Sequence, residues 1–136
     1  MKGLLAAVVI LGLAVVAILL RAQAQKPVQR FGMVIGIKPD KISAYEALHA
    51  ASNPGIRDLL GKYHMHNFTI YIHQLDNGQY YEFGYYEYTG NDLAGDRAKM
   101  AKEPRNIEWL SHTDPLQTPL PGEKGWSMMQ EVFHNQ

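Results

Sequence analysis

The sequence predicts an α+β domain in which one antiparallel sheet carries its helices on a single face. Two stretches with the alternating apolar pattern of strands flank an Asp-Asn-Gly turn at 76–78, which predicts a hairpin. Helical patterns over 41–63 and 89–103 follow the first and third strand patterns, and a last strand pattern ends the chain. The resulting order, β-α-β-β-α-β, is that of a ferredoxin-like sheet.

The first half of this domain is expected to hold one strand and one interrupted helix. The strand is predicted over Arg30–Ile37, where apolar side chains alternate with glycine and valine, and Pro39 ends it. The helix is predicted over Lys41–Tyr63. Because proline lacks an amide donor and disfavours helical backbone before it, Pro54 predicts a break near Ser52–Asn53.

The second half is expected to hold a hairpin, a second helix and a last strand. The hairpin strands are predicted over His66–Leu75 and Gln79–Tyr88. The second helix is predicted over Thr89–Glu103, and a short helical piece over Asn106–Ser111 follows it. A proline-rich loop then leads to the final strand, predicted over Trp126–His134.

Both faces of the predicted sheet carry bulky side chains. In the first strand Phe31 and Val34 point to opposite faces. In the third strand Tyr81 points to the face opposite that of Tyr80 and Tyr86. A sheet with one face in water alternates more cleanly between apolar and polar residues. Since two helices cover one face only, we predict a homodimer in which the sheets pack face to face.

Residues 1–24 differ sharply from the rest of the chain. Lys2 precedes an uncharged apolar run of eighteen residues, Gly3–Leu20, which Arg21 closes before a small-x-small pattern at 22–24. The segment is typical of a signal peptide or of an uncleaved apolar helix that anchors the protein in a membrane. The run is longer than the usual signal core of about 7–15 residues, whereas the cleavage pattern favours removal. We expect export to the periplasm or exterior, with tethering to the membrane if the leader is retained.

The remainder divides into a short polar linker at 25–29 and a single domain at 30–136. Basic and acidic residues number thirteen each in the whole chain, so no basic surface for nucleic acid is expected. Cysteine is absent, which excludes disulfides and thiol catalysis. His64, His66 and His73 do not converge on one metal site, because His66 and His73 are seven residues apart on a strand and so point to opposite faces. Neither a metal nor a cofactor is expected.

Tyr45 and His49 are the candidates for chemistry. Four residues apart in the predicted helix, they share the inward stripe that begins at Ile42. A phenol and an imidazole directed together at a sheet can move protons on a small polar ligand, and histidine titrates near neutral pH. The alternative from the residues alone is a core tyrosine beside a hydrogen-bonded histidine.

Six segments, taken together in their order and spacing, resemble the L-rhamnose mutarotase family. The likeness runs from about Arg30 to Phe133 through KPDKISAYEALHAASNPGIRDLL, HNFTIYI, the Asp-Asn-Gly turn, YYEFGYYEY, WLSHTDP and MQEVF. The resemblance implies a dimeric α/β barrel that interconverts the α and β anomers of L-rhamnose or a related sugar. It implies an isomerase that needs no cofactor.

The resemblance also implies roles for individual residues. His49 would be the main acid and base, and Tyr45 its partner. Trp109 matches the first of two adjacent tryptophans that form an apolar wall against the sugar.

Three further positions complete the implied binding site. Asn67 and Tyr71 match an asparagine and a tyrosine of the second strand whose polar groups would hold sugar hydroxyls. Asp114 matches the aspartate of the threonine-aspartate-proline stretch, where it would orient a loop or a partner.

Three positions depart from the family pattern. Asn53 and Leu110 stand where the family has tryptophan, and Glu108 stands where it has arginine. The predicted sugar wall is therefore smaller and less aromatic. With the long apolar leader, these departures support a second hypothesis, a non-catalytic, membrane-anchored accessory subunit of a larger complex. A sugar-binding module without turnover is a third.

Overall fold

The computed structural model describes residues 28–135. The signal peptide or membrane anchor predicted over 1–24 lies outside these residues, and so does most of the linker, so export stays a prediction. Within the described part of the chain, none of the helices combines the length and the apolar character needed to cross a bilayer.

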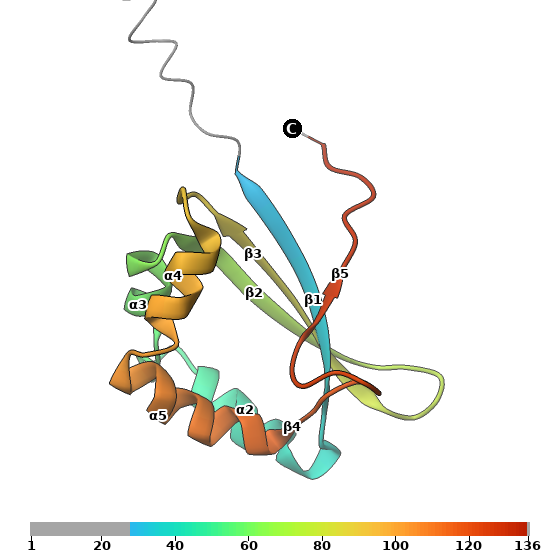
Figure 1. The fold of residues 1–136 in the computed structure, drawn as a ribbon. Helices are drawn as coiled ribbons and strands as arrows, with labels where there is room; N and C mark the ends of the chain where they lie inside the picture. Colours follow the sequence, from blue (N-terminus) through green and yellow to red (C-terminus); the bar gives the residue numbers. More distant parts are fainter. Residues whose placement is uncertain (1–27, 136) are drawn as a thin grey trace, which may run out of the picture.

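An antiparallel sheet forms the centre of the domain (Figure 1). Its long strands are β1 (Gln29–Ile37), β2 (Met65–Gln74) and β3 (Tyr80–Tyr88), arranged in the order β2-β3-β1. Two short strands, β4 (Gln117–Thr118) and β5 (Ser127–Met129), both pair with β1. The predicted α+β class and antiparallel hairpin are confirmed. The dimeric barrel stays a prediction.

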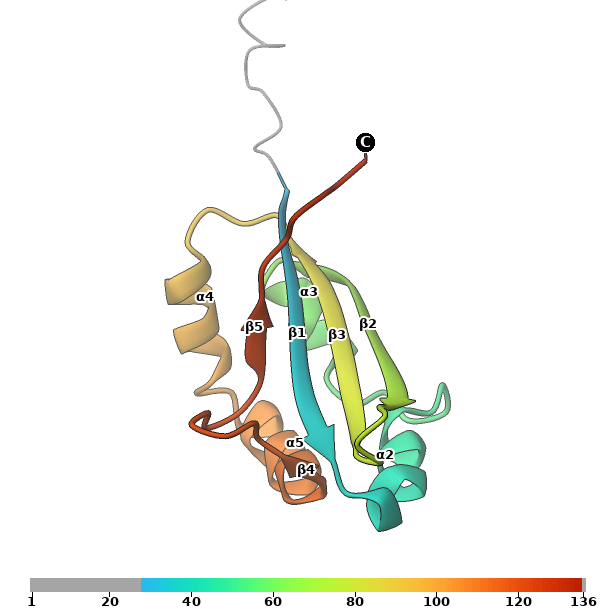
Figure 2. The ribbon, with the colours of Figure 1, turned by 90° about the vertical axis from the view of Figure 1, so that its right-hand side faces the viewer.

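The helices lie along one face of the sheet, called here the inner face (Figure 1). Figure 2 looks onto the opposite, outer face, which none of the helices in residues 28–135 crosses. The α-helices are α2 (Ile42–His49), α3 (Arg57–Lys62), α4 (Leu93–Met100) and α5 (Pro104–Thr113), and two 3₁₀ turns, η1 (Pro39–Lys41) and η2 (Asp114–Leu116), flank α2 and α5.

The predicted break in the first helical segment is confirmed. Helix α2 ends at His49, and α3 begins eight residues later, at Arg57. The Arg57 guanidinium donates hydrogen bonds to the carbonyl oxygens of His49 (2.8 Å) and Asn53. Because the last carbonyls of a helix lack partners within it, these bonds stabilise the end of α2 and the loop that follows.

The second helical segment is shorter than predicted and the third is longer. Asp92 begins α4 as an N-cap, since its carboxylate accepts a bond from the Gly95 amide (2.9 Å). Pro104 occupies the first turn of α5, where a missing amide hydrogen costs nothing. The proline therefore starts α5 rather than only ending the preceding helix.

The prediction for the last strand is wrong in extent. The strand covers only Ser127–Met129, and residues 130–135 have no regular structure. Part of the predicted proline-rich loop instead forms β4, whose Gln117 pairs with Ile37 of β1.

The inner face holds the hydrophobic core. Buried side chains of the sheet, of α3 and of α4 gather there, including Met33, Leu59 and Tyr86. Register places Ile35 of β1 and Ile72 of β2 on either side of Glu82 in β3. An acidic residue thus lies between two apolar side chains on the inner face.

Candidate active site

A cavity of about 1360 Å³ opens between the inner face and the helices. It is larger than the roughly 300–1,000 Å³ typical of small-molecule sites. All six predicted site residues line it: Tyr45, His49, Asn67, Tyr71, Trp109 and Asp114.

His49 is fixed by its neighbours on α2. Its ring stacks on the Tyr45 ring with centroids 4.2 Å apart, and its Nδ1 lies 2.9 Å from the Tyr45 carbonyl oxygen. A carbonyl oxygen only accepts, so Nδ1 carries the hydrogen and Nε2 keeps a free lone pair. Burial, aided by the charge of Arg57, lowers the pKa of His49. A neutral imidazole with an unprotonated Nε2 is suited to act as a base.

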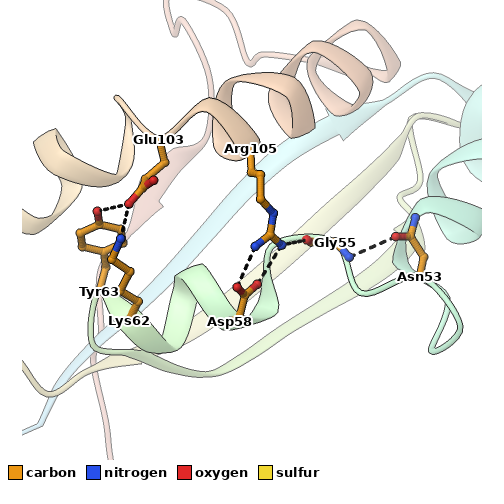
Figure 3. Close-up of polar contacts among 7 residues, drawn as sticks. All are labelled: Asn53, Gly55, Asp58, Lys62, Tyr63, Glu103 and Arg105. Atoms are coloured by element: carbon orange, nitrogen blue, oxygen red, sulfur yellow. Dashed lines mark hydrogen bonds and ion pairs between the residues drawn. The ribbon is translucent and has the colours of Figure 1, made fainter.

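Trp109 reaches His49 from α5. The two rings meet edge to face, with centroids 5.0 Å apart. Arg105, one turn earlier on the same helix, binds both carboxylate oxygens of Asp58 (2.7 and 2.9 Å) and the carbonyl of Gly55 (2.7 Å; Figure 3). These bonds attach α5 to α3 and to the loop before it, and so hold the tryptophan over the imidazole.

A second contact joins α5 to α3 at the other end of the interface. Glu103 accepts a hydrogen bond from the Tyr63 hydroxyl (2.5 Å) and pairs with Lys62 (Figure 3). Because Glu103 directly precedes Pro104, the pair fixes the start of the helix that carries Trp109.

The backbone of Gly55 lies against the Trp109 ring, and replacing Gly55 with alanine should disturb the site. Its φ of +54° is left-handed, which costs an L-residue about 1–2 kcal/mol. A Cβ there would also lie 3.1 Å from the Trp109 ring. We expect Gly55→Ala to lower stability in urea unfolding and, through the displaced ring, to lower any sugar turnover by up to roughly 100-fold.

Gly78→Ala is the matched control. Its φ of +76° imposes the same backbone penalty, but no atom lies within 4 Å of the added carbon. It should lose similar stability and keep turnover. Equal turnover losses in the two variants would contradict the role given to Gly55.

Tyr45 is almost completely buried, at 4 % exposure, and its phenol lies against Glu82 and Gln117. Gln117 Nε2 donates to Glu82 Oε2 at 2.7 Å. Burial raises the pKa of Glu82 to about 7, and burial together with the Glu82 charge raises the pKa of Tyr45. At neutral pH the phenol is therefore a hydrogen-bond donor, not a base.

Sequence reasoning missed Glu82. The signal was its position, since it alternates with Phe83 and shares the inward parity of Tyr86 and Tyr88 in β3. An acidic residue at a buried position of a strand is uncommon without a function or a partner.

Asp114 lies where α5 passes into η2 and lines the same cavity. Asp114 is exposed as a residue, and partial desolvation of its carboxyl group raises the pKa of that group. Its neighbours Thr113 and Gln117 are buried and also line the cavity, so the polar end of the site comes from one short segment.

Asn67 and Tyr71 line the cavity from β2, at its edge toward the outer face of the sheet. Tyr71 pairs with Phe83 and is 66 % exposed. Asn67 adopts a left-handed φ of +51° at a bulge and donates to Glu87 on that face (2.8 Å).

Phe68 takes the inward position next to that bulge. Its ring stacks on Tyr86, with centroids 5.4 Å apart and planes 9° from parallel, and it lines the cavity. The second strand therefore contributes an apolar ring to the cavity in addition to the polar side chains of Asn67 and Tyr71.

A sequence model of the L-rhamnose mutarotase family matches residues 30–135. The chain belongs to the L-rhamnose mutarotase family. A crystal structure of an L-rhamnose mutarotase from Formosa agariphila is similar, with a TM-score of 0.58 and 15 % sequence identity over 79 % of this chain and 99 % of that chain. At this identity the likeness concerns the fold. No curated protein sequence matches the chain.

Membership of the mutarotase family implies an enzyme of the isomerase class that acts on carbohydrates. The structure also locates two of the departures from the family pattern. Leu110 lines the cavity beside Trp109, so an aliphatic side chain extends the wall there. Asn53 accepts a bond from the Gly55 amide (3.1 Å) and so braces the loop between α2 and α3.

Proposed function

We propose that the protein is a mutarotase that interconverts the anomers of L-rhamnose or a related 6-deoxy hexose, with His49 and Tyr45 as its acid–base pair. The observation that carries the proposal is the fixed orientation of the His49 imidazole. Its Nδ1 is committed to the Tyr45 carbonyl, which leaves Nε2 as a base within a cavity that a buried phenol also lines.

Mutarotation needs one base and one acid. His49 Nε2 would accept the proton of the anomeric hydroxyl while the bond between C1 and the ring oxygen breaks. Tyr45 would donate to the ring oxygen as it leaves. Rotation of the new aldehyde and closure by the reverse transfers give the other anomer.

The walls of the cavity support a sugar with an apolar edge. Trp109 and Phe68 present rings, and Leu110 an aliphatic side chain, on which the C–H face and the methyl group of a 6-deoxy hexose would pack. Asp114 supplies a polar group at the other end for sugar hydroxyls.

Saturation-transfer NMR between the two anomer signals tests this function. The purified protein should accelerate exchange of L-rhamnose, or of another 6-deoxy hexose in a panel with L-fucose and D-glucose, above the buffer rate. Exchange at the buffer rate for every sugar would overturn the proposal. Calorimetric binding without exchange would instead identify a sugar-binding module. The family match favours the enzyme over an accessory subunit.

We further propose that a second copy of the chain covers the outer face. Val34, Phe83 and Tyr85 lie there half-buried, with no helix of residues 28–135 above them. Replacing Phe83 with glutamate should place a charge in the interface and convert a dimer to a monomer in sedimentation velocity. Leu75→Glu, at the exposed end of the hairpin, should leave the dimer intact. A wild-type monomer would contradict this proposal.

A further inference from the structure

Glu82 is a buried acidic side chain that the two-residue mechanism does not use. Its exposure is 0 %, and its neighbours on the inner face, Ile35 and Ile72, are apolar. Within residues 28–135 Gln117 donates to one oxygen, Oε2, and the other oxygen, Oε1, has no hydrogen-bond partner. Burying a carboxyl group with one oxygen lacking a hydrogen-bond partner is unfavourable, so Glu82 calls for a role.

The carboxyl group lies against the Tyr45 phenol and does not line the cavity. Tyr45 lines the cavity, whereas Glu82 does not, so Glu82 would contact a ligand only through Tyr45. Gln117 lines the cavity and fixes the carboxyl group through its 2.7 Å bond. The three side chains come from α2, β3 and β4, and lie together between the cavity and the core.

We propose that Glu82 is a positioning residue that holds Tyr45 and replaces the proton that Tyr45 gives to the ring oxygen. This inference rests on the proposed function. It predicts that the active form carries a protonated Glu82 and an unprotonated His49.

The step balances without any co-reactant. His49 Nε2 takes the proton of the anomeric hydroxyl, the electrons of that O–H bond form the C1 carbonyl, and the bond from C1 to the ring oxygen breaks. The ring oxygen takes the Tyr45 proton, and Tyr45 takes the carboxyl proton of Glu82. An imidazolium and a carboxylate remain, and both revert when the ring closes on the other face of the aldehyde.

Proton transfer from Glu82 to Tyr45, called here the relay, removes a difficulty of the mechanism that uses His49 and Tyr45 alone. A phenol in this environment is a weak acid, because burial and Glu82 both raise the pKa of Tyr45. A tyrosinate beside a carboxylate would be strongly disfavoured. If the carboxylic acid replaces the proton as it leaves, the tyrosinate never forms.

The groups around Glu82 define the expected pH dependence. Tyr45 from α2 is the titratable group against it, Gln117 from β4 is neutral, and the flanking residues of β1 and β2 are apolar. His49, Glu46 and Asp114 are among the other titratable groups that line the cavity. The pKa of His49 is lowered by burial, so its titration limits the rate on the acid side, whereas Glu82 would limit it on the alkaline side.

The test measures anomer exchange from pH 5.5 to 9 with the sugar that wild type exchanges fastest. Above about pH 7, where the pKa of Glu82 lies, the wild-type kcat should fall about tenfold per pH unit. Glu82→Gln should lose this fall and have a kcat at least roughly tenfold lower at pH 6.5, with KM unchanged. Glu87→Gln, on the outer face of the same strand, should keep the wild-type profile. A Glu82→Gln profile equal to wild type would overturn the inference.

A second measurement does not depend on turnover. In ¹³C-glutamate-labelled protein, the carboxyl signal that Glu82→Gln removes should titrate near pH 7, and Tyr45→Phe should move its midpoint upward, because the phenol lowers the pKa of Glu82. If wild type exchanges a sugar but this signal titrates near the ordinary glutamate value, the relay alone is overturned. If no sugar exchanges, the proposed function fails, and the relay fails with it.

Discussion

Replacing His49 with glutamine should lower the enzyme-catalysed anomer exchange by roughly 10²–10⁴-fold, the usual contribution of a general base. Glutamine has a similar length and can still donate to the Tyr45 carbonyl, which His49 Nδ1 contacts at 2.9 Å. It has no lone pair basic enough to take a proton from a hydroxyl group. The loss should therefore fall on kcat more than on KM.

Saturation-transfer NMR on wild type and variant, with the buffer rate subtracted, measures this effect. His112→Gln is the control, because His112 is an exposed histidine of α5. On the acid side, wild-type activity should begin to decline only below the ordinary histidine range, since burial lowers the pKa of His49 and keeps it neutral further into acid. A loss of less than threefold in His49→Gln would remove His49 from the mechanism.

Replacing Glu82 with glutamine should stabilise the protein above pH 7, by up to about 3 kcal/mol. Burial raises the pKa of Glu82 from 4.5 to about 7 in the folded protein. Between these values the folded state binds a proton that the unfolded state does not, so wild-type stability falls as pH rises through this window. Glutamine has the same shape, fits the bond from Gln117 and carries no charge.

Urea unfolding at pH 4.5 and at pH 8 separates the two states of the carboxyl group. Wild type and Glu82→Gln should be similar at pH 4.5, and the variant should be the more stable at pH 8. Glu87→Gln should keep the wild-type decline, because Glu87 is held in its charged form by bonds from Tyr85 and Asn67, which lower its pKa. Equal stability of wild type and Glu82→Gln at pH 8 would show that the carboxyl group is solvated.

The elements that the sequence predicts well are those set by neighbouring residues. Alternating side chains and an Asn-Gly turn specify the β2–β3 hairpin locally, and Pro54 specifies the break after α2. The pairing of Tyr45 with His49 is equally local, since four residues of helix fix it. These features need no knowledge of the rest of the fold.

The elements that the sequence predicts poorly depend on contacts between residues far apart along the chain. The last strand extends only as far as β1 accepts it, and ends at Met129. The bulge in β2 sends Asn67 outward and Phe68 inward, a choice that follows from packing against Tyr86. Strand β3 is bulky at both parities, so the pattern alone did not reveal that Glu82 faces the core.

The support of Trp109 is non-local in the same way. Arg105 joins residues 47 and 50 positions earlier in the chain, and no periodicity in the sequence indicates this contact. Sequence reasoning placed the tryptophan at the site through family resemblance, whereas the reason it stays there is visible only in three dimensions.

The proposed acid–base pair and the apolar wall of the cavity come from separate segments of the chain. Tyr45 and His49 occupy one turn of α2, while Trp109 and Leu110 arrive on α5, some sixty residues later. Substitutions on α5 can therefore change the shape of the sugar-facing wall without displacing His49, the proposed base. A protein with this division can differ from its family in the wall, as at Leu110, while the residues proposed for acid–base chemistry keep their place on α2.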